Sequence, residues 1–240
     1  MTFEQARDKI IFALDVHGLA DIDRWAAQLA GHVGMFKVGK ELFTSCGPEA
    51  VRTVQRHGGR VFLDLKYHDI PNTVAKAMVE AARLGVQLAN LHALGGTEMM
   101  ATAAEAVRKE FGDGRPRLLA VTILTSATVE TLRQVGIERP VEEMVVRLAC
   151  LARDSGMDGV VASPLEIGPI RAACGPDFLI VTPGVRPSFA SLDDQMRVMS
   201  PAEAVAAGAD YLVIGRPIAK SADPVAAARS IVDEIAGNGP

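Results

Sequence analysis

The sequence predicts a (β/α)8 TIM barrel of the α/β class, because eight short apolar segments alternate with longer amphipathic ones. The apolar segments are rich in Val, Ile, Leu and Phe, as the strands of a buried parallel sheet are. The chain has 240 residues, and this fold typically takes about 250. No Pro- or Ser-rich linker divides the alternation, so we expect a single domain over residues 1–240. A doubly wound open sheet shares the alternation and is the alternative fold.

The eight predicted strands are apolar runs that end at a polar, ionisable or turn-forming residue. They comprise residues 10–16, 35–40, 60–66, 88–94, 118–124, 159–163, 178–183 and 211–215.

The predicted helices are marked by the residues of their first turns. Asp21 and Asp23 give the first an acidic start, and Pro48 opens the next, where a missing backbone N–H costs nothing. The turn Pro71-Asn72-Thr73 precedes the third, at 74–84, and the others lie at 97–111, 141–155, 164–173, 201–207 and 224–236. Glycines stand where four of these helices should end, as C′ glycines do: Gly85, Gly156, Gly175 and Gly208.

Composition excludes several classes of partner. The net charge is −4 and no basic run stands out, so nucleic-acid binding is not expected, because it needs clustered Lys and Arg. Cys46, Cys150 and Cys174 are too far apart for a zinc site or a disulfide framework. Neither a signal-peptide core nor a membrane-spanning apolar run is found in the sequence. We therefore expect a cytoplasmic protein with no membrane partner.

Polar residues recur at the carboxyl ends of the predicted strands, where barrels of this kind carry their chemistry. A buried charge is costly unless it is paired, so this recurrence predicts a shared polar pocket. The alternative is that these are ordinary strand-end residues that meet solvent. The residues concerned are Asp15, Lys37, Asp64, Lys66, Asp69, His92, Thr125, Ser126, Ser163, Arg186 and Arg216.

The most informative pair is Asp64 and Lys66 on the third strand. Side chains two apart on a strand point to the same face, so we expect the two charged groups to meet. With Lys37 and a further carboxylate such as Asp15, they form an array of alternating charge that keeps each lysine protonated. A protonated lysine is suited to donate a proton rather than to form a Schiff base. The alternative is a structural ion pair at the barrel rim. Asp69 lies in the following loop and is free to point toward a neighbouring subunit.

Two Gly-Arg turns late in the chain favour a phosphate site. Gly215-Arg216 follows the eighth strand and Gly184-Val185-Arg186 follows the seventh, which is where this fold often binds phosphate. Gln195 lies on the long segment after the seventh strand, which is suited to fold over a ligand. The five histidines lack metal-binding spacing, so no metal is expected, and His92 is interpreted as a hydrogen-bonded barrel histidine.

These motifs together resemble those of the orotidine 5′-phosphate decarboxylase family. The core, Asp64-x-Lys66-x-x-Asp69, is shared with sugar-phosphate lyases of the same superfamily, but the combined set is specific and runs along nearly the whole chain. It consists of Ala13-Leu14-Asp15, Phe36-Lys37-Val38-Gly39, Ile70-Pro71-Asn72-Thr73, Leu124-Thr125-Ser126, Pro183-Gly184-Val185-Arg186-Pro187 and Val213-Ile214-Gly215-Arg216-Pro217.

The resemblance implies a decarboxylase that converts orotidine 5′-monophosphate to uridine 5′-monophosphate in pyrimidine biosynthesis without a cofactor. It implies that Lys66 donates a proton to C6 of the pyrimidine, within the charged array of Asp64 and Lys37. It also implies a homodimer, and these further roles: Asp15 and Lys37 on the ribose hydroxyls; Asp69, Ile70 and Thr73 in the partner's site; Ser126 and the backbone near Thr125 on the pyrimidine; Arg186, Gln195, Gly215 and Arg216 on the phosphate.

Two other functions stay open at this level. A Mg²⁺-dependent lyase or aldolase acting on a keto-sugar phosphate would share the core motif. Such enzymes are similar to this chain but have an acidic residue at the position of Lys37. The positive charge of a lysine there opposes the binding of a divalent metal ion. A non-catalytic barrel that senses a nucleotide would keep Gly215 and Arg216 but tend to lose the lysine–carboxylate array.

Overall fold

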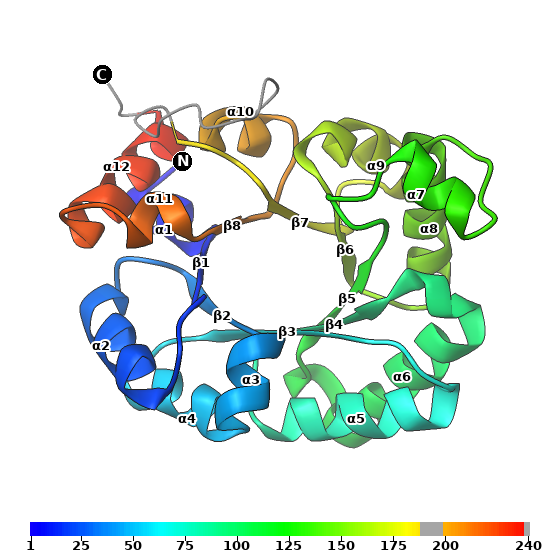
Figure 1. Ribbon diagram of the computed structural model, residues 1–240, viewed down its shortest axis with the longest axis horizontal. Coiled ribbons are helices and arrows are strands. Elements are labelled where there is room, and N and C mark those ends of the chain that lie inside the picture. Colours follow the sequence, from blue (N-terminus) through cyan, green and yellow to red (C-terminus); the bar gives the residue numbers. More distant parts are fainter. Residues whose placement is uncertain (188–198, 238–240) are drawn as a thin grey trace.

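Eight parallel strands close into a barrel in the order β1 to β8, each paired with the next along the chain and β8 paired with β1. The arrangement comes from a computed structural model that describes residues 1–187 and 199–237. Figure 1 looks into the ring of strands, with the helices around it. The (β/α)8 prediction is confirmed, and the closed ring excludes the doubly wound open sheet.

The strands are shorter than predicted at most of their carboxyl ends. Their bounds are β1 Ile10–Ala13, β2 Met35–Gly39, β3 Val61–Tyr67, β4 Leu88–His92, β5 Arg117–Val121, β6 Gly159–Val161, β7 Leu179–Pro183 and β8 Tyr211–Ile214. The apolar runs continue past the last paired residue because Leu14 and Ile123 remain buried after leaving the sheet. Hydrophobicity alone therefore extended the strands into the loops that surround the barrel mouth.

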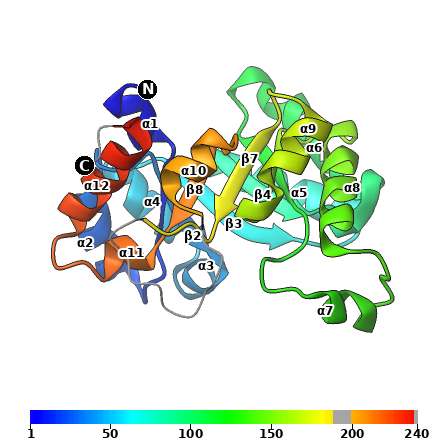
Figure 2. The ribbon, with the colours of Figure 1, turned by 90° about the horizontal axis from the view of Figure 1, so that it is seen from above.

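The predicted helices are all present with ends shifted by a few residues. They are α2 Leu19–Leu29, α4 Glu49–Arg56, α5 Pro71–Arg83, α6 Gly96–Phe111, α8 Val141–Asp154, α9 Ile167–Cys174, α10 Pro201–Ala206 and α12 Pro224–Ala236. Four short helices were not predicted as elements: α1 Phe3–Asp8, α3 Lys40–Cys46, α7 Val129–Gln134 and α11 Arg216–Ala219. Three of these, α3, α7 and α11, follow strands directly or through a loop and lie on the same end of the barrel, with α7 standing away from it (Figure 2).

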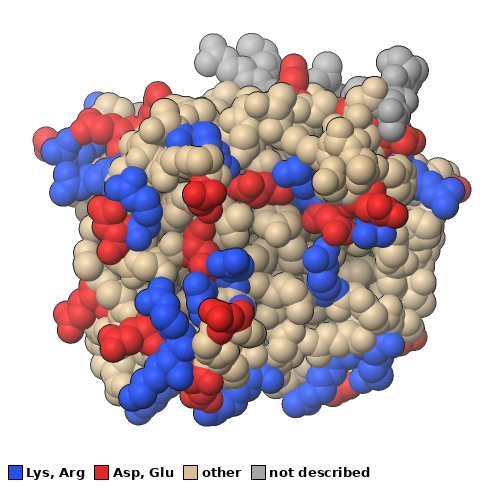
Figure 3. Space-filling model, turned by 180° about the vertical axis from the view of Figure 1, so that it is seen from behind, with Lys and Arg blue, Asp and Glu red and all other residues tan. Residues whose placement is uncertain are grey.

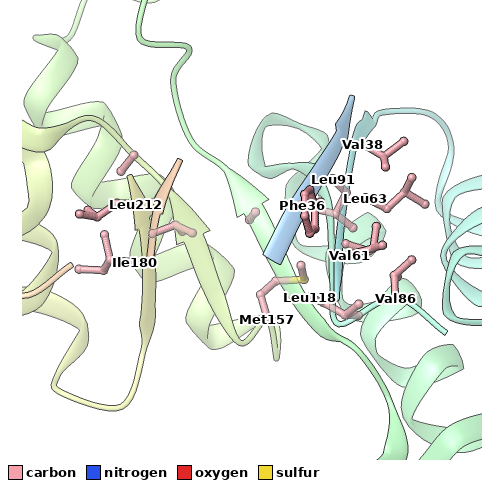
Figure 4. Packing of buried hydrophobic residues seen from close by; sticks show 14 of the residues in the cluster. Phe36, Val38, Val61, Leu63, Val86, Leu91, Leu118, Met157, Ile180 and Leu212 are labelled. Carbon is pink, nitrogen blue, oxygen red and sulfur yellow. The ribbon is translucent and has the colours of Figure 1, made fainter. Parts of the chain in front are cut away.

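Side chains of the strands alternate between the barrel interior and the helix layer. Those that point outward, such as Val38, Val61 and Leu63, meet the surrounding helices (Figure 4). The inward set forms a separate apolar plug across the barrel, made of Ile11, Met35, Phe62, Leu88, Leu119 and Val181. Because this plug fills the interior between the two ends of the barrel, ionisable side chains that point inward are confined to those ends.

At the amino end of the barrel, the side chain of the residue just before β4, β6 and β8 accepts a hydrogen bond from a backbone N–H of the preceding strand. Gln87 accepts from the N–H of Val61 at 2.7 Å, and Asp158 from that of Leu118 at 2.7 Å. Asp210 accepts from the N–H of Ile180 at 2.8 Å. These bonds satisfy amides near the starts of β3, β5 and β7 and fix the strand register at this end.

Within residues 1–187 and 199–237, no helix is both long enough and apolar enough to cross a membrane.

Candidate active site

Four side chains of alternating charge gather at the carboxyl end of the barrel. Lys66 Nζ lies 2.5 Å from Asp64 Oδ1, and Lys37 Nζ lies 3.7 Å from Asp64 Oδ2 and 3.3 Å from Asp15 Oδ1. Asp64 and Lys66 come from β3, Lys37 from β2, and Asp15 from the loop after β1. The predicted meeting of Asp64 with Lys66 is confirmed, and the order Asp15–Lys37–Asp64–Lys66 is the interleaved array that the sequence indicated.

Asp64 is the most deeply placed member of the array and stays ionised. Its side chain is 11% exposed. Burial alone would raise the pKa of its carboxyl group, but the charges of Lys66 and Lys37 and the hydrogen bonds from Lys66 and Asn90 outweigh it and lower the pKa from 3.8. A permanent negative charge is therefore held between two lysines in a poorly solvated corner of the site.

The backbone of β3 is irregular where the catalytic candidates lie. From Leu63 to Tyr67 the chain advances four residues, while the paired positions on β4 advance two, from Ala89 to Leu91, which leaves two extra residues in β3. Lys66 has a φ of 53°, and no other non-glycine residue in the described ranges has a positive φ. Such a conformation costs on the order of 1–3 kcal/mol and occurs mostly at functional sites. The regular alternation assumed from the sequence is thus broken here, and the two charges meet through a bulge.

Sequence reasoning missed Asn90, a fully buried residue in the middle of β4. Its Nδ2 donates to Asp64 Oδ1 at 2.7 Å, and its Oδ1 accepts from the backbone N–H of Lys66 at 2.8 Å. An amide within the otherwise apolar run Leu88-Ala89-Asn90-Leu91 was the available signal, because a buried amide needs partners.

Two cavities meet at the array. One, of about 160 Å³, lies between Asp15, Lys37 and the start of α3. The other, of about 190 Å³, has a mostly apolar wall, with Lys37, Asp64 and Lys66 at one end. Its remaining lining residues are Phe62, Val121, Ile123, Leu124, Thr125, Val161, Pro183 and Val213. A flat, apolar-faced group can be held here with one edge against an ammonium and a carboxylate.

Of the predicted phosphate-binding residues, Gly215 is the one whose described contacts place it beside the array. Gly215 packs against the end of β1, where an added Cβ would lie 3.2 Å from Ala13 Cβ and 3.5 Å from Asp15 Oδ2. Arg216 starts α11 and is exposed. The N–H of Arg186 donates to Met199 O at 3.1 Å. Gln195 lies outside the described residues.

The other predicted residues lie around the rim. Thr125 lines the larger cavity, and Ser126 next to it is exposed. Asp69 and Thr73 are exposed and Ile70 is 67% exposed. Asp69 Oδ1 accepts from the N–H of Ile70 at 2.7 Å. Within the described part of the chain, Asp69, Ile70 and Thr73 make no contact with the array.

His92 differs from its interpretation as a hydrogen-bonded histidine. No hydrogen bond to its ring is found among the described residues, and the ring packs against that of His68, with centroids 5.6 Å apart. Burial, followed by the charges of His68, Lys40 and Lys66, lowers the pKa of His92 to about 4. The described residues contain no cluster of three His, Cys, Asp or Glu side chains suited to hold a metal ion.

Comparison with known proteins covers nearly the whole chain. The profile of the family described as "Orotidine 5'-phosphate decarboxylase / HUMPS family" matches residues 8–231. Two proteins named orotidine 5'-phosphate decarboxylase are similar to this chain. The one from Pelobacter propionicus is 78% identical over 100% of both chains, and the one from Geobacter sulfurreducens is 70% identical over 98% of this chain and 99% of the other. The crystal structure of orotidine 5'-phosphate decarboxylase from Lactobacillus acidophilus superimposes with a TM-score of 0.84 at 38% identity, covering 94% of this chain and 98% of the other.

Proposed function

The chain belongs to the orotidine 5′-phosphate decarboxylase / HUMPS family, and from that premise we propose how its charged array carries out decarboxylation. The reaction is the conversion of orotidine 5′-monophosphate to uridine 5′-monophosphate in pyrimidine biosynthesis, and the protein is a carboxy-lyase. The observation that carries the proposal is the contact of Lys66 Nζ with Asp64 Oδ1 at 2.5 Å, at the end of an apolar cavity.

Asp64 and Lys66 divide the work at C6 of the pyrimidine. The bond from C6 to the carboxylate breaks, carbon dioxide leaves, and the electron pair stays on C6. Asp64, held ionised beside the leaving carboxylate, disfavours the bound substrate relative to the transition state, in which that carboxylate loses its charge. The ammonium of Lys66 stabilises the charge that develops on C6 and then transfers its proton there. Lysine regains a proton from solvent after product release.

The remaining residues bind the parts of the substrate that do not react. The pyrimidine lies in the larger cavity against Thr125 and Ser126, and the ribose hydroxyls meet Asp15 and Lys37, which are already paired at 3.3 Å. The phosphate is held by Gly215, which packs beside Asp15, together with Arg186, Gln195 and Arg216. Binding energy from this distant phosphate orients the ring for reaction.

Two copies of the chain form the active enzyme. Asp69, Ile70 and Thr73 lie exposed beside the bulge of β3, and in a homodimer they reach the partner's site and complete the array there. Mixing inactive Lys66→Ala and Asp69→Ala subunits then restores some activity, because a mixed dimer has one intact site. We also propose that residues 1–240 form one domain and that the enzyme is cytoplasmic.

The array needs neither metal nor cofactor for this reaction. Lys37 Nζ lies within 4 Å of both Asp15 and Asp64 and occupies the place where a divalent cation would bind those carboxylates. This argues against the Mg²⁺-dependent lyase and aldolase reactions of the superfamily.

The test is an absorbance assay of orotidine 5′-monophosphate in the presence of a chelator. We expect full turnover by the wild-type protein and a loss of 10²–10⁴-fold in the Lys66→Ala variant, the usual contribution of general acid catalysis. Binding of uridine 5′-monophosphate by that variant is the control for a folded site. Near wild-type turnover by Lys66→Ala would contradict the role of Lys66, and inhibition by the chelator would contradict the metal-free reaction.

A further inference from the structure

We propose that Asn90 is a positioning residue, whose side-chain amide fixes the bulge of β3 and thereby sets where the Lys66 ammonium lies relative to Asp64. The inference rests on the proposed function, because it concerns the same array, but Asn90 has no part in the proton transfer itself.

The first argument is the place of Asn90 opposite the bulge. Two extra residues of β3 lie between the pairs Leu63↔Ala89 and Tyr67↔Leu91, and Asn90 is the β4 residue between them. The regular backbone pairing is interrupted there, so the N–H of Lys66 needs another acceptor. Asn90 Oδ1 supplies it at 2.8 Å. A side-chain amide thus replaces the missing backbone partner at the residue with a positive φ.

The second argument is that the same amide holds the carboxylate. Asn90 Nδ2 donates to Asp64 Oδ1 at 2.7 Å, and that oxygen is also the one 2.5 Å from Lys66 Nζ. One planar group therefore connects the main chain of Lys66 to the side chain that its ammonium contacts. Only a residue with an acceptor and a donor on one planar group makes both bonds, which an ionised carboxylate or an apolar side chain cannot do.

The third argument is burial. Asn90 is 0% exposed, so removing its amide leaves a void and deprives the buried N–H of Lys66 of its acceptor. The left-handed backbone of Lys66 then relaxes toward a commoner conformation, because a strained conformation persists only where its surroundings enforce it. A shift of this kind at a catalytic side chain impairs turnover more than it impairs binding of a distant phosphate.

The experiment compares Asn90→Ala and Asn90→Asp with the wild-type dimer. In Asn90→Ala we expect kcat to fall by about 10- to 100-fold, while the KM for orotidine 5′-monophosphate and the affinity for uridine 5′-monophosphate change by less than about threefold. Thr53→Val is the matched control, because it removes another buried hydrogen bond, to Glu49 O at 2.8 Å within α4, and neither residue lines a cavity at the array. We expect it to lower thermal stability without lowering kcat.

Asn90→Asp separates positioning from packing, because it keeps the shape of the side chain. The titratable groups around position 90 are Asp64 and Lys66 of β3 and His92 two residues further along β4, with Lys37 one strand further, while its pair on β5 is Leu119. Ionised, the new carboxylate opposes Asp64 and cannot donate to it. Protonated, it donates to Asp64 and accepts from Lys66 as the amide does. We expect its kcat to recover relative to wild type as the pH is lowered from about 8 to about 5.

A kcat within twofold of wild type in both variants, or a pH profile of Asn90→Asp parallel to that of the wild type, would overturn the inference. If Asn90→Ala does not fold, Asn90→Asp alone decides. If the wild type itself lacks turnover, the proposed function has failed, and the inference is then read from NMR titration of the Asp64 carboxyl group. The pKa of Asp64 is higher in Asn90→Ala than in the wild type if the hydrogen bond from the Asn90 amide to Asp64 exists. An unchanged pKa contradicts the inference.

Discussion

The two ends of the barrel each bury a carboxylate among cations, but the cations are arginines at one end and lysines at the other. At the amino end, Asp158 accepts hydrogen bonds from both terminal guanidinium nitrogens of Arg115, at 2.5 and 2.7 Å, and also from Arg117 and the N–H of Leu118. At the carboxyl end, Asp64 lies between Lys37 and Lys66. The two carboxylates are about equally buried, with side chains 9% and 11% exposed.

What differs is how much bonding capacity is left over. The fork of Arg115 matches a carboxylate bidentately and leaves Asp158 saturated. An ammonium is a point charge with three donors, and Lys66 directs one to Asp64 while its neighbourhood opens into a cavity. We infer from this difference that the arginine end stabilises the fold and that the lysine end is reserved for a ligand.

On the surface seen from the side opposite to that of Figure 1, acidic and basic side chains are interspersed (Figure 3).

The largest expected effect is at the lysine end, on turnover. Asp64→Asn keeps the shape of the side chain but removes the charge between two lysines, so we expect kcat/KM to fall on the order of 10²–10³-fold, as for loss of one preorganised electrostatic group. Stability should fall less than at Asp158, because Lys37 keeps Asp15 as a partner and the cavity admits water. Steady-state kinetics with thermal unfolding measures both. Turnover within tenfold of wild type would remove the distinction between the ends.

The next effect, at the arginine end, is on stability. Asp158→Asn leaves the guanidinium of Arg115, whose side chain is 15% exposed, without its ionic partner. Removing one member of a buried pair costs about 3 kcal/mol, which lowers the Tm by about 6–12 °C for a chain of this size. Chemical denaturation gives the free energy of unfolding. The folded variant should keep kcat, and Asp154→Asn, on the exposed surface of α8, is the control. A loss of kcat in folded protein would show that the amino end also acts on the site.

The pH dependence of that stability has a definite sign. Burial would raise the pKa of Asp158, but the hydrogen bonds of Arg115 and of the N–H of Leu118 outweigh it and hold the pKa below its usual value of 3.8. A carboxyl group whose pKa is lowered on folding stabilises the protein above its unfolded pKa, and this contribution is lost as the pH falls through the folded value. The stability difference between wild type and Asp158→Asn should therefore narrow below about pH 4.

The same contrast explains what was predictable from the sequence. The barrel, the array of Asp15, Lys37, Asp64 and Lys66, and the site end of the barrel follow from patterns that can be found along the chain, in the alternation of segments and in the residues at the strand ends. The role of Asn90 and the bulge of β3 depend on the register between β3 and β4, which a one-dimensional pattern does not contain. The short helix α3 was missed because the predicted strand was extended to Lys40, whereas β2 ends at Gly39 and Lys40 is the first residue of the helix. Sequence thus finds the charged groups, while pairing between strands decides how they are held.

The smallest effect sharpens the picture of the lysine end as a place of excess positive charge. His92 is partly buried near Lys40 and Lys66 and packs against His68. Its pKa of about 4 keeps the ring neutral in the folded protein, although an unfolded histidine is half protonated near 6.5. Because the unfolded chain binds this proton and the folded one does not, His92 lowers stability progressively as the pH falls from about 6.5 to about 4. NMR titration of the imidazole measures the pKa directly. In His68→Gln the pKa should rise, since one of the opposing charges is gone, and an unchanged titration near 6.5 in the wild type would show that the lysine end is better solvated than its geometry indicates.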